Sequence, residues 1–106
     1  MPKYLVSISY TAEGAKGVRQ DGGTKRREVA GHAVESVGGK IESFYFCFGP
    51  VDAVIIADLP DAAAAAAVSM AVSATGAAHL TTTPLITAEE MDKAAGKKTA
   101  YKAPGA

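Results

Sequence analysis

The chain is short of the residues that mark secreted, redox-active or membrane proteins. Cys47 is the only cysteine among 106 residues, so no disulfide can form within the chain, and we expect a reducing, cytoplasmic setting. The apolar runs are too short and interrupted to span a bilayer, and the N-terminus leads directly into a strand pattern rather than a signal peptide. Eleven basic residues balance eleven acidic ones, which gives no general attraction to nucleic acid or to an anionic membrane. We therefore expect neither as a partner.

Large apolar side chains are also scarce. The sequence has no Trp and only three Phe, and its apolar content is rich in alanine. Because alanine buries little area, an Ala-rich contact stabilises a core less than a Leu contact does. A thin core of this kind gains further burial by association. We expect one domain over residues 1–96, followed by a loose tail over residues 97–106 that has no apolar period.

The most informative segment covers residues 38–60, where β-branched and aromatic residues form two apolar runs. Gly, Pro and Asp separate the runs at residues 49–52, which predicts two strands joined by a tight turn. Three phenylalanines, Phe44, Phe46 and Phe48, are expected on one face of the first strand. The other face is expected to carry Ile41, Ser43, Tyr45 and Cys47.

The chain begins with one strand pattern followed by one helix pattern. A half-buried strand is predicted over residues 3–10, with Ser7 and Ser9 on its more polar face. Thr11 is the expected N-cap of a weak helix over residues 12–20.

A stronger helix is predicted after a break at Gly22-Gly23, with Thr24 as its cap and Gly38-Gly39 at its end. Its apolar stripe is expected to consist of Val29, Ala30, Ala33, Val34 and Val37, and its wet face of Lys25, Arg26, Arg27, Glu28 and Glu35.

After the hairpin, Asp61 is the expected cap of a helix that runs through six consecutive alanines to about residue 74. The small side chains of this helix would let it lie close to its neighbours. A last strand is predicted over residues 77–85, and the capping box of Thr87 and Glu90 starts a short helix to about residue 95.

The order is therefore β-α-β-β-α-β with an extra C-terminal helix and a split first helix. Two right-handed β-α-β crossovers predict a ferredoxin-like α+β fold, an antiparallel sheet in the order 4-1-3-2 with helices on one face. Both faces of the hairpin are apolar, and one layer of helices covers only one of them. We expect a second copy to cover the other face, in a homo-oligomer built sheet to sheet. The pattern does not distinguish a dimer from a trimer or a higher state.

Five segments together resemble the GYD domain family, a group of small bacterial proteins. They are Pro2-Lys3-Tyr4-Leu5-Val6, Tyr10-Thr11-Ala12-Glu13-Gly14-Ala15-Lys16-Gly17, Glu35-Ser36-Val37-Gly38-Gly39-Lys40, Phe44-Tyr45-Phe46 and Thr82-Thr83-Pro84-Leu85-Ile86-Thr87. The resemblance covers roughly residues 2–92. It implies the ferredoxin-like protomer of the dimeric α+β barrels, in which protomers pack sheet against sheet. It implies no substrate, cofactor or catalytic residue.

The family takes its name from a Gly-Tyr-Asp turn, and this chain departs from it. The corresponding turn is Gly49-Pro50-Val51-Asp52, in which only the Gly and the Asp match. A function that depends on this tyrosine in relatives has no equivalent side chain in the turn of this chain.

The candidate ligand-binding residues form a polar patch on the face of the sheet away from the helices. His79, Thr81 and Thr83 of the last strand are expected to share this face with Ser7 and Ser9 of its neighbour. The rest of the face is expected to carry Tyr45, Ile55 and Leu5. An imidazole with a pKa of about 6.5 can act as an acid, a base or a ligand, but the alternative is a histidine that only hydrogen-bonds at a subunit interface.

For four other features we favour a purely structural interpretation over a functional one. His32 lies between two glutamates of a helix, where solvated charges are a better interpretation than a metal site. Cys47 is expected in mid-strand, where its thiol is unreactive. Asp52 is expected to bind backbone N–H groups of the turn. Three cations, Lys25, Arg26 and Arg27, open a helix against its dipole, which makes them a candidate anion contact, although an exposed face is the simpler interpretation.

The leading functional hypothesis is a small cytoplasmic oligomer with a small-molecule pocket at or near the subunit interface. A second hypothesis is an enzyme of the mono-oxygenase or isomerase type that uses His79, by analogy of fold. A third is a structural or regulatory interaction module without a ligand. The sequence assigns no catalytic residue, metal or cofactor.

Overall fold

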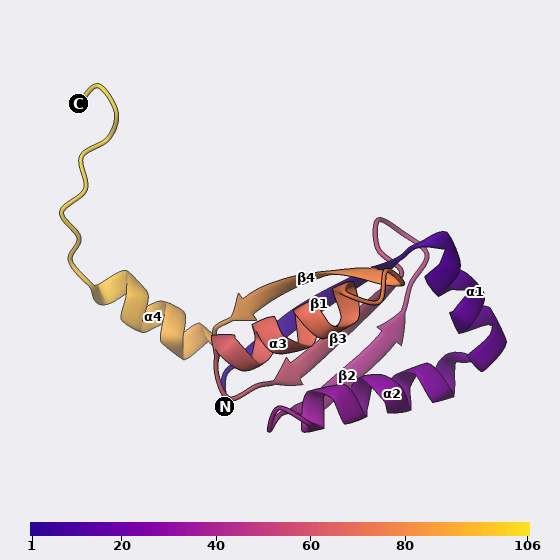
Figure 1. The fold of residues 1–106 in the computed structure, drawn as a ribbon. Helices are drawn as coiled ribbons and strands as arrows, with labels where there is room; N and C mark the ends of the chain where they lie inside the picture. The colour runs from indigo at the N-terminus through magenta and orange to yellow at the C-terminus, as the bar shows by residue number, and fades with distance from the viewer.

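The computed structural model describes all 106 residues as a four-stranded sheet with helices on one side (Figure 1). The elements follow in the order β1 (Lys3–Tyr10), α1 (Ala12–Asp21), α2 (Gly23–Glu35), β2 (Lys40–Phe46), β3 (Ala53–Asp58), α3 (Ala62–Ser73), β4 (Ala78–Leu85) and α4 (Ala88–Gly96). The predicted order of elements and the ferredoxin-like α+β class are confirmed.

The sheet has the strand order β2-β3-β1-β4, and every neighbouring pair is antiparallel. The predicted order 4-1-3-2 is therefore confirmed. Helix α2 packs on β2 and helix α3 packs on β4, so the two helices lie over opposite halves of the sheet. The central strands β1 and β3 run beneath the space between them.

The helical region after β1 is split at one glycine. Gly22 has a φ of 82°, a left-handed conformation that glycine adopts without steric cost. Its N–H donates to the Val18 carbonyl at the end of α1, and its carbonyl accepts from the Arg26 N–H in the first turn of α2. The break at Gly22-Gly23 is confirmed, but the prediction that Thr24 caps the second helix is wrong. Because Gly22 ends one helix and begins the next, no separate capping residue fits between them.

Helix α1 is held against the start of β4 by a close backbone approach. Thr11 caps the helix as predicted, since its hydroxyl accepts from the Gly14 N–H at 3.2 Å. The Thr11 N–H also donates to the Ala77 carbonyl at 2.9 Å. A Cβ placed at Gly14 would lie only 1.9 Å from that same carbonyl oxygen, so this contact requires glycine.

The central hairpin differs from the prediction at two places. The register of β2 against β3 shifts between Ile41 and Ser43, which is a β-bulge. As a result Ile41 packs against the core on the helix side, whereas Ser43 lies on the other face; the prediction that they share a face is wrong. Strand β2 also ends at Phe46, so Cys47 and Phe48 belong to the connecting loop rather than to the strand.

The core lies on the helix side of the sheet. Of the 11 buried residues, those in the strands are Tyr4, Val6, Ile8, Ala53, Ile55, Ala57 and Ala78. The register places all seven on the face beneath the helices, since paired residues of neighbouring strands share a face. Ile55, which we expected beside the polar patch, is therefore on the helix side. We call the opposite side the open face, and none of its residues is buried.

Helix α4 projects away from the rest of the molecule (Figure 1). All residues from Ile86 to the C-terminus are exposed. The radius of gyration is 16.8 Å, against about 13 Å for a compact chain of this length. Residues 97–106 form neither helix nor strand. The capping box predicted for Thr87 and Glu90 is present at the start of α4.

No helix in this chain has both the length and the apolar character that a membrane span requires.

Candidate functional site

The open face brings five of the six predicted ligand-binding residues together. Ser9 pairs with His79 and Ser7 pairs with Thr81 across the β1–β4 ladder, and Thr83 faces Leu5 in the next row. Directly opposed side chains of an antiparallel pair have Cβ atoms about 5 Å apart. The predicted polar patch therefore exists as a set of neighbours.

Tyr45 is on the same face but not beside the patch. It pairs with Val54 of β3, which in turn pairs with Ser7 of β1. Tyr45 thus lies two strands from Ser7, a separation of about 10 Å at the usual strand spacing. The apolar side chains of the open face include Leu5, Val54, Ile56 and Tyr45.

One end of the open face carries an exposed ion-pair network. The Lys3 ammonium lies 2.9 Å from the Asp58 carboxylate and 3.2 Å from the Glu42 carboxylate. Its hydrogen bonds to Asp58 and then Glu42 raise the pKa of Lys3, and the Lys3 hydrogen bond lowers the pKa of Asp58. The Lys3 and Glu42 side chains are nearly half exposed and that of Asp58 is about one-fifth exposed, so solvent screens the network and it contributes little to stability.

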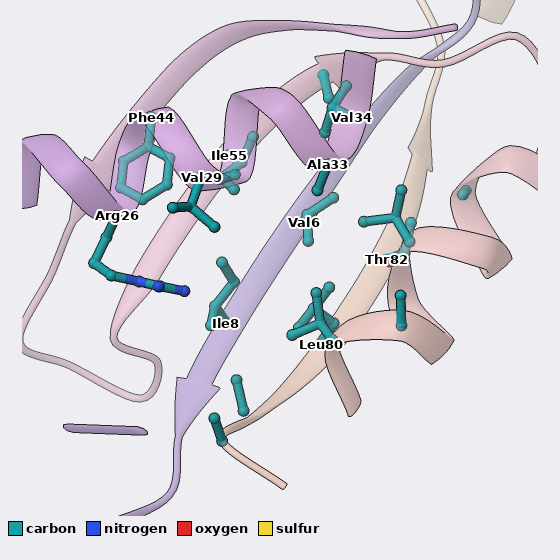
Figure 2. A pocket seen from close by; sticks show the side chains of 18 of the residues that line it. Val6, Ile8, Arg26, Val29, Ala33, Val34, Phe44, Ile55, Leu80 and Thr82 are labelled. Atoms are coloured by element: carbon teal, nitrogen blue, oxygen red, sulfur yellow. The ribbon is translucent and has the colours of Figure 1, made fainter. Parts of the chain in front are cut away.

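A second candidate site lies on the other side of the sheet, in a cavity of about 250 Å³ between α2, α3 and the central strands (Figure 2). Val6 and Ile8 of β1 and Ile55 of β3 form its floor. Residues of α2 and α3 form its walls, among them Val29, Ala33, Val34, Val68 and Val72. Eighteen of the 21 lining residues are hydrophobic, which makes the cavity an apolar site.

The sequence of the helices explains why this space is not filled. Helix α3 begins with six consecutive alanines, capped by Asp61, whose carboxylate accepts from the Ala64 N–H at 2.8 Å. Ala65 lies on the sheet, so α3 contacts β4 closely, as its small side chains allow. The same small side chains do not reach across to α2. On that helix Ala30 and Ala33 face the gap, so short side chains border the cavity from both helices.

Arg26 lies at one end of the cavity and is its only charged lining residue. Figure 2 shows its side chain extending from α2 toward Ile8 of β1. Its guanidinium is 3.5 Å from the Asp21 carboxylate, and the two side chains are one-third and about one-quarter exposed. The prediction that Arg26 belongs to the wet face of the helix is wrong. It precedes Val29, Ala30 and Ala33 by three, four and seven positions, which places it on the apolar stripe.

Tyr10, at the end of β1, lines the same end of the cavity. Burial raises the pKa of the Tyr10 phenol, the neighbouring Arg26 guanidinium opposes the shift and Asp52 adds to it. The phenol is therefore protonated at neutral pH and able to donate a hydrogen bond.

Asp52 fixes the backbone at this end of the sheet. Its carboxylate accepts from the Tyr10 N–H at 2.8 Å, and its own N–H donates to the Ile8 carbonyl at 2.8 Å. The prediction that this carboxylate binds backbone N–H groups is confirmed in kind, but the donor is in β1 rather than in the turn. Asp52 thereby joins the hairpin loop to the strand that carries Tyr10.

The remaining candidates are not brought into either site. His32, Lys25 and Arg27 are exposed on α2. The Cys47 thiol lies in the hairpin loop, where it donates to the Val51 carbonyl at 3.2 Å. No group of three or more His, Cys, Asp or Glu side chains is placed to hold a metal ion.

The family comparison agrees with the fold. The model of the GYD domain matches residues 4–95, and the chain belongs to this family. No curated protein and no solved structure matches the chain. Membership thus identifies the domain without naming a ligand or a reaction.

Proposed function

We propose that this protein is a small homo-oligomeric binding protein. In this proposal an apolar small molecule occupies the cavity between α2, α3 and the sheet, and a second copy covers the open face. The cavity is the observation that carries the proposal. Its shape and lining are typical of small-molecule sites, which are concave, mostly apolar and have few polar groups.

The size of the cavity limits the ligand. An engineered protein cavity of about 150 Å³ binds benzene, whereas drug-sized ligands occupy pockets of roughly 300–1,000 Å³. A cavity of about 250 Å³ lies between these classes. It suits a molecule somewhat larger than a single aromatic ring, such as a fused bicyclic aromatic or a medium-length acyl chain.

The polar patch has a different place in this proposal. Ser7, Ser9, His79, Thr81 and Thr83 do not line the cavity. In a sheet-to-sheet assembly they would face the second copy, together with Tyr45. That they bind a ligand at the interface stays a prediction, and so does the assembly itself.

Ligand binding is tested by thermal unfolding with a series of neutral bicyclic aromatics and medium-chain alcohols. A ligand that binds only the folded protein stabilises it by about 2.7 kcal/mol at roughly a hundredfold excess over its Kd. For a domain of this size we expect the melting temperature to rise by on the order of 10 °C.

The variant Ala33→Leu locates the site, because the larger side chain extends into the cavity. We expect it to fold, to unfold at the same or a higher temperature than the native chain, and to lose the stabilisation by ligand. Ala63→Leu makes the same change at an exposed position of α3 and should respond to ligand normally. Full stabilisation of Ala33→Leu, or no stabilisation of the native chain by any compound, contradicts the proposal.

A further inference from the structure

We infer that the ligand of this cavity is a monocarboxylic acid, with its apolar body between α2 and α3 and its carboxylate bound by Arg26 and the Tyr10 hydroxyl. The inference rests on the proposed function, since it names the chemical class of the ligand for the same cavity. The observation behind it is that one cationic side chain, that of Arg26, lies at the end of an otherwise apolar cavity.

The first observation is the isolation of this charge. Among the 21 lining residues only Arg26, Thr75 and Thr82 are not hydrophobic, and only Arg26 is charged. A charged group beside apolar surface is costly unless it is paired. The Arg26 side chain is only one-third exposed, whereas its neighbours Lys25 and Arg27 on the same helix are exposed to solvent.

The second observation is that the pairing with Asp21 is partial. The single contact between the two side chains is 3.5 Å long, whereas a charge-assisted hydrogen bond is about 2.7–2.9 Å long. A guanidinium has five N–H donors and binds a carboxylate most strongly through two parallel hydrogen bonds. The contact with Asp21 therefore leaves donors of Arg26 available to a second carboxylate. The first turn of α2 contains no acidic residue that could take them.

The third observation is a second donor at the same end. The phenol of Tyr10 lines the cavity near Arg26, and it is protonated at neutral pH, since the ordinary pKa of a phenol is about 10 and burial raises it further. The position of its residue is fixed by the hydrogen bond from its N–H to the Asp52 carboxylate. A guanidinium and a phenol together present donors to one oxyanion, whereas a neutral ligand brings no negative charge to the guanidinium, whose neighbour on the cavity side is the neutral Tyr10 phenol.

The test compares matched acids and alcohols by titration calorimetry at pH 7. The two pairs are 1-naphthoate with 1-naphthalenemethanol, and octanoate with octanol, since each pair differs only in its head group. For at least one pair we expect the native chain to bind the acid about tenfold more tightly than the alcohol. In Arg26→Gln we expect the acid to lose about that factor and the alcohol to bind as before.

Three controls separate a bound carboxylate from a general effect of charge. Arg27→Gln removes an exposed charge from the adjacent position and should leave both affinities unchanged. Arg26→Lys keeps the charge but not the fork of donors, so it should restore part of the preference. Tyr10→Phe should reduce the affinity for the acid by a smaller factor than Arg26→Gln. If Arg26→Gln does not fold, the ratio of acid to alcohol in the native chain still decides.

The failures can be told apart. Equal binding of acid and alcohol by the native chain overturns the carboxylate while the cavity site stands, and so does a preference that Arg26→Gln leaves intact. Binding of none of the four compounds, together with no stabilisation by any neutral compound, overturns the proposed function and this inference with it.

Discussion

Both faces of the sheet carry large apolar side chains, but only one face is covered by the chain's own helices. On β1 alternate residues Tyr4, Val6 and Ile8 are buried beneath the helices, whereas Leu5, between them, is only half-buried. On β3 the same alternation separates buried Ile55 from half-buried Ile56. The few large apolar side chains of this chain are therefore divided between both faces, although its own helices cover only one.

The helix side is covered incompletely and the open face not at all. Two alanine-bordered helices over opposite halves of the sheet leave a cavity between them. The open face has no helix above it and combines an apolar half with the polar pairs of β1 and β4. We therefore expect a small molecule to complete the first face and a second copy of the protein to complete the second.

The largest effect is expected from a charge placed on the open face. Tyr45→Glu should convert the proposed homo-oligomer to monomers, because an unpaired charge buried at an interface costs about 3–5 kcal/mol, or more than a hundredfold in Kd. Met70→Glu is the matched control, since Tyr45 is 68% exposed and Met70, on α3, is 67% exposed. Sedimentation at micromolar concentration measures both. A native chain that is strictly monomeric, or a greater effect from Met70→Glu, would contradict the proposal that a second copy covers the open face.

On the helix side, the stability of the protein should depend on which glycine of α1 is replaced. Gly14→Ala places a Cβ against the Ala77 carbonyl oxygen and should lower the free energy of unfolding by about 1–3 kcal/mol. Gly17→Ala, in the same helix, meets nothing within 4 Å and should raise it by roughly 0.5–1 kcal/mol. Denaturant unfolding decides, and equal effects of the two substitutions would show that α1 does not approach β4 as described.

The attachment of the hairpin loop to β1 should depend on the side-chain oxygen of residue 52. Asp52→Ala leaves the partly buried Tyr10 N–H without its acceptor and should cost about 1–2 kcal/mol. Asp52→Asn keeps a side-chain carbonyl oxygen at the same distance and should cost less. If both variants are as stable as the native chain, the hydrogen bond to Tyr10 does not hold the loop.

The smallest effect is expected from the ion pairs at the end of the open face. The pKa of Asp58 is lowered in the folded protein, so its contribution is present above the unfolded pKa of about 3.9 and is lost as the pH falls through the folded value. The pKa of Lys3 is raised, so its contribution is present below its ordinary value of 10.5 and is lost as the pH rises through the folded one.

Asp58→Asn should therefore destabilise the protein slightly at neutral pH and not at all in strong acid. Asp92→Asn on α4 forms no ion pair with the rest of the chain and serves as the control. Urea unfolding of both variants across the acid range provides the measurement. An equal difference at every pH would mean that the Asp58 charge is not involved.

Much of the fold could be predicted because it depends on local chemistry. Thr11, Asp61 and Thr87 cap helices in the structure as they were expected to, since the acceptor oxygen and its N–H donor are three residues apart. Strand order followed from the handedness of the crossovers. Thr24 failed as a cap because a glycine conformation two residues earlier had already begun the helix.

The cavity could not be predicted, because its volume depends on the distance between α2 and α3. The bulge at Ile41 also has no mark in the alternation of the strand, and it moves that residue to the other face. The position of Arg26, by contrast, could have been predicted from the sequence. Its spacing to Val29, Ala30 and Ala33 places it on the apolar stripe, whereas its charge alone favours a solvent-exposed position.

The most direct test of a division of roles between the faces is a methyl NMR titration of the native protein with 1-naphthoate. We expect the shifts to move for methyl groups that line the cavity, such as those of Val29, Val68 and Leu80. The chemical shifts of the methyl groups of Leu5, Val54 and Ile56 should not change. Shifts confined to the open-face methyl groups would contradict the account.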